Sequence, residues 1–501
     1  MTSVYGRCTV CGATLRGVEA VPVDVEVAVS RGVPRFSLVG MPDLAVQEAR
    51  ERVCAALRAC GFSMPNDKVV VNLAPGSLRK TGSGFDLPIA VGILSATKQV
   101  DAHVAEGMLV VGELSLEGAV RPVAGLLSYA TCARRLGIAL VCSGDAQGLV
   151  AIEGLEQRTM ASLSDLRTAS FGKVLTKPLV LNARGLDFAD ISGHEVAKRA
   201  LQIAAAGGHG MLMMGPPGSG KTMLASRLSS ILPPLTETEA LETAQVHSVA
   251  GEDLSTVLGG VRPFRCPHHS ASQAGLVGGG SPPRPGEISL AHNGILFLDE
   301  LPEFKSSVLQ GIRQPLESGS VTITRADGNV TFPARFMLIA AANPCPCGYF
   351  GDPEIFCKCS ASQVSSYQNR IGGPLMDRID IHVDVSRIPP HEVLETGSGT
   401  DSDTLREAVQ RARTFASWRR AHTGRDERGG RPPDLVSSSD MSKDDQLFLE
   451  RAARVNGMSG RALIRTLAVA RTVADMEEEP RVSKRHLCEA IGLRFREGVG
   501  A

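Results

Sequence analysis

The sequence predicts an α/β fold in which helices flank a central parallel sheet, with an α+β region before it and a helical region after it. Three short apolar runs predict the sheet, because such runs are typical of strands buried on both faces. Each run ends in residues that can carry chemistry. The runs are residues 211–214 before Gly215, 295–298 before Asp299, and 336–342 before Asn343.

The first run leads into a phosphate-binding loop of the pattern G-x-x-x-x-G-K-[ST]. Glycines let successive backbone N–H groups point at phosphate oxygens, and the following helix adds its dipole to the anion site. We expect Lys221 to reach the β- and γ-phosphates of ATP and the Thr222 hydroxyl to bind Mg²⁺. The alternative, a glycine turn with a chance lysine, is disfavoured by the strand–loop–helix order. The loop consists of Gly215, Pro216, Pro217, Gly218, Ser219, Gly220, Lys221 and Thr222.

The second run ends in two adjacent carboxylates, Asp299 and Glu300. We expect Asp299 to hold Mg²⁺ through water and Glu300 to orient and activate the attacking water. The two carboxylates could instead cap the following helix. Their distance from the phosphate loop, roughly 75 residues, favours a doubly wound ATPase with insertions.

Three more residues are candidates for catalysis. Asn343 could contact the γ-phosphate and the water, or it could start a turn. Arg378 stands between two aspartates, so it is either in a local ion pair or an arginine finger for the γ-phosphate of a neighbouring subunit. Arg461 opens a helix and could contact ATP, with Arg465, one turn later, as the second choice.

Length, charge, apolar content and cysteine content limit the kinds of protein that this chain can be. A chain of 501 residues holds two to four domains, and 53 basic against 53 acidic residues give a formal net charge of zero. Contacts with nucleic acid would therefore come from local basic patches. No long apolar run or cationic leader is present, so we expect a cytoplasmic protein with no membrane contact. In that compartment the twelve cysteines favour free thiols or metal over disulfides.

Composition and periodicity divide the chain into residues 1–166, a linker at 167–189, the nucleotide motifs at 190–390 and a helical part at 400–498. In the first part, the pattern predicts strands at 21–29, 68–73 and 109–116 and a helix at 44–60.

Several stretches resemble the magnesium-chelatase-like AAA+ ATPases, and most closely the ComM/YifB family. These stretches are residues 200–222, 266–270, 285–304 and 373–381. The resemblance implies an AAA+ core, a C-terminal helical lid and a ring hexamer that hydrolyses ATP between subunits. It also implies a DNA substrate (single-stranded, duplex or branched) and a branch-migration helicase of recombination or natural transformation. The alternative is a chelatase-like or chaperone-like ATPase that remodels a protein partner.

Residues 321–332 predict a β-hairpin, since two alternating strands flank an Asp327-Gly328 turn. Related motors carry a hairpin here that projects into the pore of the ring. Arg325 near its tip could contact a phosphate backbone. An edge hairpin that only packs between subunits is the alternative.

Four cysteines in a C-x-C…C-x-C pattern suit a structural, tetrahedral Zn²⁺ site, although the spacing within each pair is tighter than usual. Free thiols are the main alternative. The isolated pair Cys8 and Cys11 is expected to serve no metal, and His268 and His269 are expected in structural or subunit contacts. The four candidate zinc ligands are Cys345, Cys347, Cys357 and Cys359.

Residues 80–90 and 111–125 resemble the proteolytic domain of Lon, which implies a Lon-like α+β fold for residues 1–166. Serine–lysine catalysis would need a serine four residues after Lys80 and a lysine after the V-x-G turn. Gly84 and Leu127 stand at those places. We therefore expect a binding or assembly domain without protease activity.

Overall fold

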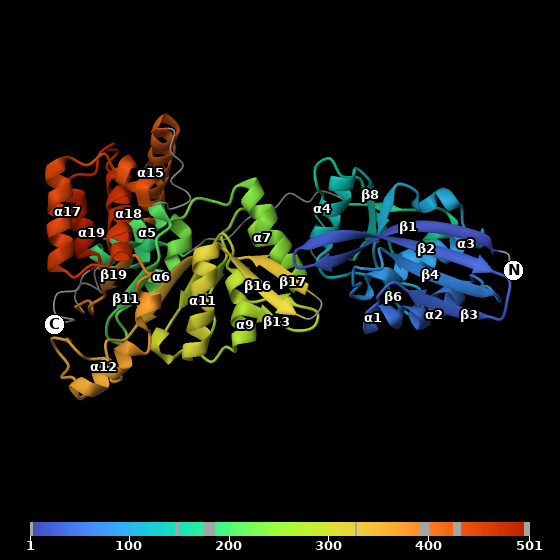
Figure 1. The fold of residues 1–501 in the computed structure, drawn as a ribbon, viewed down its shortest axis with the longest axis horizontal. Coiled ribbons are helices and arrows are strands. Elements are labelled where there is room, and N and C mark those ends of the chain that lie inside the picture. The colour runs from blue at the N-terminus through green and yellow to red at the C-terminus, as the bar shows by residue number, and fades with distance from the viewer. Residues whose placement is uncertain are drawn as a thin grey trace.

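The computed structural model describes residues 4–145, 150–174, 186–325, 328–389, 400–423 and 432–494. The molecule is elongated, with the N-terminal sheet at one end, the central sheet in the middle and the C-terminal helices at the other end (Figure 1). Within these ranges, no helix combines the length and apolar character needed to cross a membrane.

The N-terminal domain is built on an eight-stranded mixed sheet in the order β10-β9-β8-β5-β1-β2-β4-β3. β1 and β2 form a long antiparallel hairpin, and the predicted strands at 21–29 and 68–73 lie within β2 and β4. Since β10 pairs with β9, the sheet continues beyond residue 166. The strands are β1 (Val4–Arg16), β2 (Glu19–Ser30), β3 (Arg35–Val39), β4 (Lys68–Ala74), β5 (Met108–Val110), β8 (Ala139–Ser143), β9 (Gln157–Met160) and β10 (Gly172–Lys173).

Two predicted elements of this domain are interrupted. The helix at 44–60 is split into α1 (Leu44–Gln47) and α2 (Ala49–Ala59). The strand at 109–116 is split into β5 and β6 (Glu113–Leu114), and β6 pairs with β7 (Val120–Arg121) in a separate ribbon. Gly112 stands at the break, where a Cβ would lie 2.9 Å from the side chain of Val120.

Helices cover both faces of the N-terminal sheet. α2 and α3 (Asp86–Ala96) contribute to the core on one face, and α4 (Leu126–Leu136) to the core on the other. The second core continues into the next domain through α7 (Glu237–Ala250) and α8 (Ser255–Leu258). At this junction the Gly125 N–H donates to the carbonyl oxygen of Ser248 at 2.9 Å.

The central domain contains a five-stranded parallel sheet in the order β12-β15-β18-β11-β19. β18 lies between β11 and β15, so the C-terminal ends of the three apolar runs meet at one edge of the sheet. The strands are β11 (Met211–Met214), β12 (Phe264–Arg265), β15 (Ile295–Leu298), β18 (Met337–Ala342) and β19 (Ile381–Asp384).

Alternate side chains of these strands face two cores. Met211 and Met213 pack with α5 (Glu195–Gly207) and α6 (Lys221–Ile231). Leu212 packs on the opposite face with α9, α10 and α11. The other elements of this part of the domain are the helices α9 (Gln273–Val277), α10 (Glu287–Leu290), α11 (Ser306–Ser318), α12 (Ala361–Asn369) and α13 (Gly373–Met376) and the short strands β13 (Gly278–Gly279) and β14 (Arg284–Pro285).

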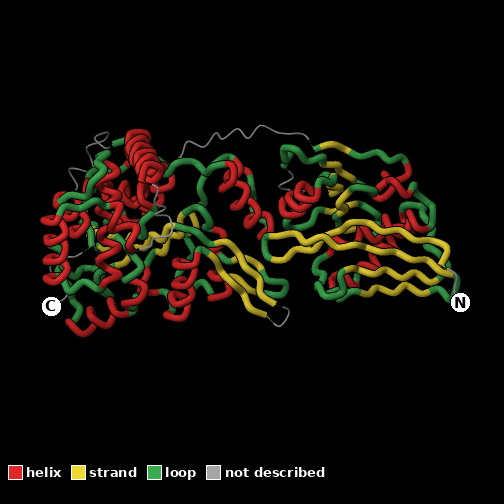
Figure 2. Tube along the Cα trace, turned by 45° about the horizontal axis from the view of Figure 1, so that its top comes forward, coloured by secondary structure: helices red, strands yellow, loops and turns green. Residues whose placement is uncertain are grey.

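A hairpin of β16 (Ser320–Arg325) and β17 (Gly328–Pro333) follows α11 and leads directly into β18. It points toward the N-terminal domain (Figures 1 and 2). Asp327 of the predicted turn lies outside the described residues.

The C-terminal helices pack against α5 and α6. A buried ion pair holds them together, with Arg419 Nε 2.9 Å from Asp475 Oδ1. The helices are α15 (Ser402–Thr423), α16 (Pro432–Ser438), α17 (Lys443–Val455), α18 (Gly460–Met476) and α19 (Lys484–Gly492).

Candidate nucleotide site

The phosphate loop joins β11 to α6 at the C-terminal edge of the central sheet. Gly218 and Gly220 have φ of 77° and 84°, a left-handed conformation that glycine adopts without steric cost. A Cβ on Gly215 would lie 2.0 Å from the carbonyl oxygen of Val385, so only glycine fits there. This backbone suits a loop whose N–H groups turn toward a phosphate.

The Lys221 ammonium is folded back into its own loop. Its Nζ donates to the carbonyl oxygens of Gly215 and Pro216, each at 2.8 Å. Burial lowers the pKa of Lys221, although the charge of Asp299 opposes this effect. A phosphate in the loop would take the place of these carbonyl oxygens as the partner of the ammonium.

Thr222 and Asp299 are in direct contact. Thr222 Oγ1 donates to Asp299 Oδ2 at 2.7 Å, across the end of the strand that separates β11 from β15. Hydroxyl and carboxylate oxygens are the protein ligands that Mg²⁺ takes in P-loop enzymes. The two residues therefore fit a Mg²⁺ ion that is shared with nucleotide phosphates.

Glu300 is half-exposed, and its carboxylate is paired with a histidine. Oε2 lies 3.2 Å from Nδ1 of His269, which follows β12, the strand next to β15. The Glu300 backbone has a φ of 51°, an uncommon conformation for a residue with a side chain. Sequence reasoning missed this pairing, because the sheet order rather than any local spacing brings the two residues together.

Asn343 follows β18, between the phosphate loop and the two carboxylates. Its Oδ1 lies 3.3 Å from Lys221 Nζ, within hydrogen-bond distance. The amide therefore already contacts the group that is expected to hold the γ-phosphate.

The two candidate arginines meet at one carboxylate. Arg378 Nη2 lies 2.7 Å from Glu317 Oε1, and Arg461 Nη2 lies 3.7 Å from the same oxygen. Arg465 instead pairs with Asp380 and donates to the carbonyl oxygen of Arg378 at 2.9 Å. Among the described residues, neither Arg378 nor Arg461 bonds to the phosphate loop of its own chain. The Arg378 side chain is 13% exposed, whereas that of Arg461 is 52% exposed.

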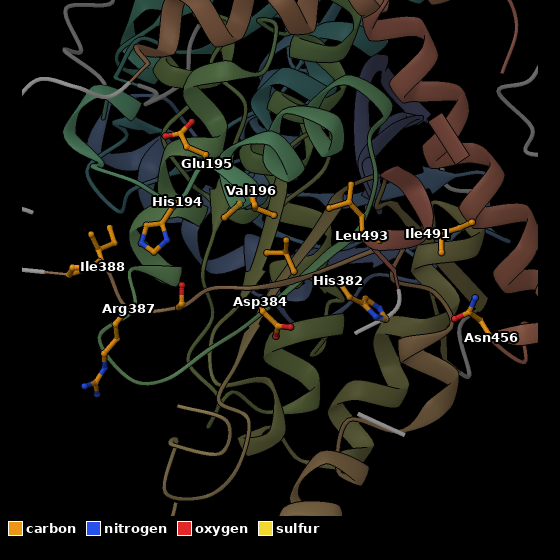
Figure 3. A pocket seen from close by; sticks show the side chains of 15 residues that line it. His194, Glu195, Val196, His382, Asp384, Arg387, Ile388, Asn456, Ile491 and Leu493 are labelled. Carbon is orange, nitrogen blue, oxygen red and sulfur yellow. The ribbon is translucent and has the colours of Figure 1, made fainter. Parts of the chain in front are cut away.

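A cavity of about 900 Å³ is lined by residues that include His194, Asp384 and Arg387 (Figure 3). His194 also lies next to the phosphate loop, since a Cβ on Gly220 would lie 3.3 Å from its Nε2. The mixed apolar and polar lining, and a volume in the range of small-molecule sites, suit the base and ribose of a nucleotide. Sequence reasoning missed this cavity because separate segments form its walls. Its lining includes His194, Val196, Asp384, Arg387, Ile388, Asn456, Ile491 and Leu493.

The four cysteines of the C-x-C pairs form one cluster, with their sulfur atoms all within 4.8 Å of one another. Cys347 Sγ lies 3.4 Å from Cys345 Sγ and 3.6 Å from Cys357 Sγ. A tetrahedral zinc with Zn–S bonds of about 2.3 Å would need sulfur–sulfur distances of about 3.8 Å, whereas a disulfide would need about 2.05 Å. Backbone N–H groups of Tyr349 and Lys358 lower the pKa of the Cys347 thiol to about 6, whereas desolvation and the neighbouring cysteines raise the pKa of the Cys357 thiol to about 12. The sulfur–sulfur distances are close to the zinc value and far from the disulfide value. The cluster therefore fits zinc.

The cysteine loop touches the phosphate loop. Gly348 has a φ of 88°, and a Cβ there would lie 2.5 Å from Cδ of Pro217. The segment that a metal would fix is therefore one wall of the nucleotide site.

Cys8 and Cys11 lie on opposite faces of β1. Cys8 packs against the core of α2 and α3, and Cys11 packs against the core of α4. Residues three apart on a strand point to opposite faces, so these thiols cannot share a metal.

The N-terminal domain offers Ser83 no basic partner among the described residues. The Ser83 hydroxyl donates to Glu113. Lys80 is fully buried with its Nζ bound to the carbonyl oxygen of Pro75, and Leu127 is buried.

Family descriptions match three successive parts of the chain. The family described as "Magnesium chelatase, subunit ChlI" matches residues 187–393. "Subunit ChlI of Mg-chelatase" matches residues 25–144, and "Magnesium chelatase, subunit ChlI C-terminal" matches residues 399–494.

Relatives of similar length match almost the whole chain. The Competence protein ComM of Haemophilus influenzae is 41% identical over 98% of this chain and 97% of its own. An uncharacterized protein YifB of Salmonella typhimurium is 42% identical over 95% of both chains. An uncharacterized protein of Mycobacterium tuberculosis is 39% identical over 92% of this chain and 93% of its own.

Proposed function

Because the chain belongs to the ComM/YifB family of magnesium-chelatase-like AAA+ proteins, we propose that it is an ATP-driven DNA motor that works as a ring hexamer. The specific activity we propose is branch migration of DNA in recombination or natural transformation. The observation that carries the proposal is the meeting of Lys221, Thr222, Asp299 and Asn343 at one edge of the sheet.

Each group has a distinct task in ATP cleavage. The phosphate loop and Lys221 would bind the β- and γ-phosphates, and Thr222 and Asp299 would hold the Mg²⁺ that neutralises developing charge. Glu300 would orient and activate the water, and Asn343 would position the γ-phosphate and that water. The cavity at His194 would hold the base and ribose.

Residues of a neighbouring subunit would neutralise the remaining charge on the γ-phosphate. Arg378 is our candidate finger, because guanidinium stays charged and binds phosphate oxygens in a bidentate manner. Arg461 would assist it, since both arginines reach Glu317. Such an arrangement makes hydrolysis depend on ring assembly.

DNA as the partner is supported by the competence protein among the relatives and by the position of the hairpin. The chain runs from Glu300 through α11 into the hairpin, and from the hairpin through β18 to Asn343. A hairpin inserted between two catalytic residues can move with the state of the nucleotide.

We also propose a structural Zn²⁺ in the cysteine cluster. The ion would supply no catalytic chemistry, because all four positions of a tetrahedral site would be filled by thiolates. It would instead fix the loop that packs on Pro217.

Branch migration on synthetic four-way junctions tests the main proposal. The wild type should move the junction with ATP, whereas Lys221→Ala should fail to bind nucleotide and Glu300→Gln should bind ATP without turnover. A wild type whose ATPase ignores DNA and which binds none at low salt would refute the DNA motor. A stable protein partner recovered under those conditions would then favour the protein-remodelling alternative.

A further inference from the structure

A cavity of about 750 Å³ lies between the N-terminal domain and the β16–β17 hairpin. Its walls come from the turn between β1 and β2, the loop after β4, the segment between β13 and β14, and the hairpin itself. The two domains touch at its rim, because a Cβ on Gly17 would lie 2.8 Å from the carbonyl oxygen of Thr331. The charged residues that line it are Arg16, Arg79, Arg284, Arg325 and Glu113.

The cavity concentrates positive charge in a chain whose formal net charge is zero. Arg16, Arg284 and Arg325 are exposed, and none of the three forms an ion pair with a described carboxylate. Among the residues that the structure describes, the hydrogen-bond partner of Arg16 Nη2 is the carbonyl oxygen of Asn329, at 3.4 Å. Four guanidinium groups from separate segments repel one another, so their gathering around a hollow is suited to an anion with several charges.

We propose that this cavity binds the sugar–phosphate backbone of a single nucleic-acid strand, an inference that rests on the proposed DNA motor. Guanidinium groups bind phosphate oxygens in pairs and from fixed directions, which suits a chain of phosphates. The volume is in the range of small-molecule sites, so it admits a few nucleotides of one strand rather than a duplex. The apolar part of the lining can cover bases without reading their edges. That part includes Leu15, Val123, Pro282, Pro283 and Val330.

The site gives the N-terminal domain a task in the motor. A strand in the cavity contacts Arg16 and Arg79 on one side and Arg325 of the hairpin on the other. The hairpin continues into β18, which ends at Asn343 beside Lys221. One continuous segment therefore connects the bound strand to the nucleotide site, while the N-terminal domain forms the fixed wall against which the hairpin moves.

The test compares two double variants of the N-terminal domain in the full-length protein. Arg16→Gln/Arg79→Gln removes two charges from the cavity. Arg7→Gln/Arg31→Gln is the matched control, because it removes two exposed charges at the other end of the β1–β2 hairpin, roughly 30 Å away along the strand. Fluorescence anisotropy with a fluorescein-labelled oligo(dT) strand, at several salt concentrations and with a non-hydrolysable ATP analogue, gives the affinity.

The cavity variant should bind the strand roughly 25-fold more weakly at about 0.1 M salt, and the slope of log K against log salt should fall by about 1.4. The control should bind as the wild type does, and both variants should keep the ATPase rate measured without DNA. Arg284→Gln/Arg325→Gln, on the opposite wall, should reproduce the loss. A duplex of the same sequence should be less sensitive to all these changes.

If both cavity variants bind the strand with the affinity and salt slope of the wild type, the inference is overturned, while the proposal of a DNA motor still stands. If the wild type itself binds no DNA, the proposed function fails and the inference falls with it. Cavity variants that sediment as smaller assemblies than the control would show that the arginines bind a neighbouring subunit, which would also overturn the inference.

Discussion

Nδ1 of His269 lies 3.2 Å from Oε2 of Glu300, and this contact joins the ends of two neighbouring strands of the central sheet. In the proposed mechanism Glu300 must turn its carboxylate toward the water that attacks the γ-phosphate. A carboxylate that contacts an imidazole is drawn away from that task. We infer that the contact favours an idle state of the site.

His269→Ala should raise the ATPase rate measured without DNA. A half-exposed contact of this kind contributes up to about 1 kcal/mol, so its removal corresponds to an increase of up to about fivefold. Steady-state phosphate release with and without DNA measures the effect, and stimulation by DNA should shrink accordingly. His268→Ala is the control, because the neighbouring imidazole bonds to Ser270 instead. A fall of the basal rate to the level of Glu300→Gln would show that His269 aligns the carboxylate for catalysis.

Gly348→Ala should weaken ATP binding, because the added methyl would meet Cδ of Pro217 at 2.5 Å and push the phosphate loop out of place. We expect KM for ATP to rise by about tenfold, with a smaller change in kcat. Gly351→Ala is a closely matched control: its φ of 80° imposes the same backbone strain, but a Cβ there meets nothing within 4 Å. Equal KM values for the two variants would mean that strain alone, and not the contact with Pro217, causes any loss.

Features that depend on residues close together in the chain could be predicted from the sequence. The phosphate loop needs its glycines at fixed offsets, and the alternation of residues 21–29 matches a strand that buries every second side chain and exposes Asp24 and Glu26 between them. The splitting of the predicted strand at 109–116 could not be predicted, because the close approach of Val120 and Leu87 to Gly112, which leaves no room for a Cβ, involves residues outside that stretch.

Features that depend on the order of strands in the sheet could not be predicted from the sequence. Placing β18 between β11 and β15 brings Asn343 to Lys221, and placing β12 beside β15 brings His269 to Glu300. No spacing in the chain encodes either contact. The convergence of Arg378 and Arg461 on Glu317 is of the same kind, since tertiary packing alone relates the three elements that carry them.

Arg378→Ala should lower kcat by about 10³-fold or more while each subunit still binds ATP, because a finger acts on the transition state rather than on the bound nucleotide. Mixing these subunits with Lys221→Ala subunits should restore part of the activity. The mixed ring then contains sites with an intact phosphate loop from one variant and an intact arginine from the other. Arg370→Ala, at an exposed arginine paired with Glu303, serves as the control. Mixtures that stay inactive would place Arg378 within its own subunit's site.

Cys357→Ser/Cys359→Ser should release the proposed zinc and loosen the wall of the nucleotide site. Elemental analysis should find about one zinc per wild-type chain and none in the variant. Loss of about 2 kcal/mol of local stabilisation would lower Tm by roughly 4–8 °C, and KM for ATP should rise because Gly348 no longer supports Pro217. Cys488→Ser, at an exposed cysteine on α19, should change neither quantity. A wild type that contains no metal and shows four freely titrating thiols in the cluster would contradict the zinc proposal, and the contact between Gly348 and Pro217 would then have to hold the loop unaided.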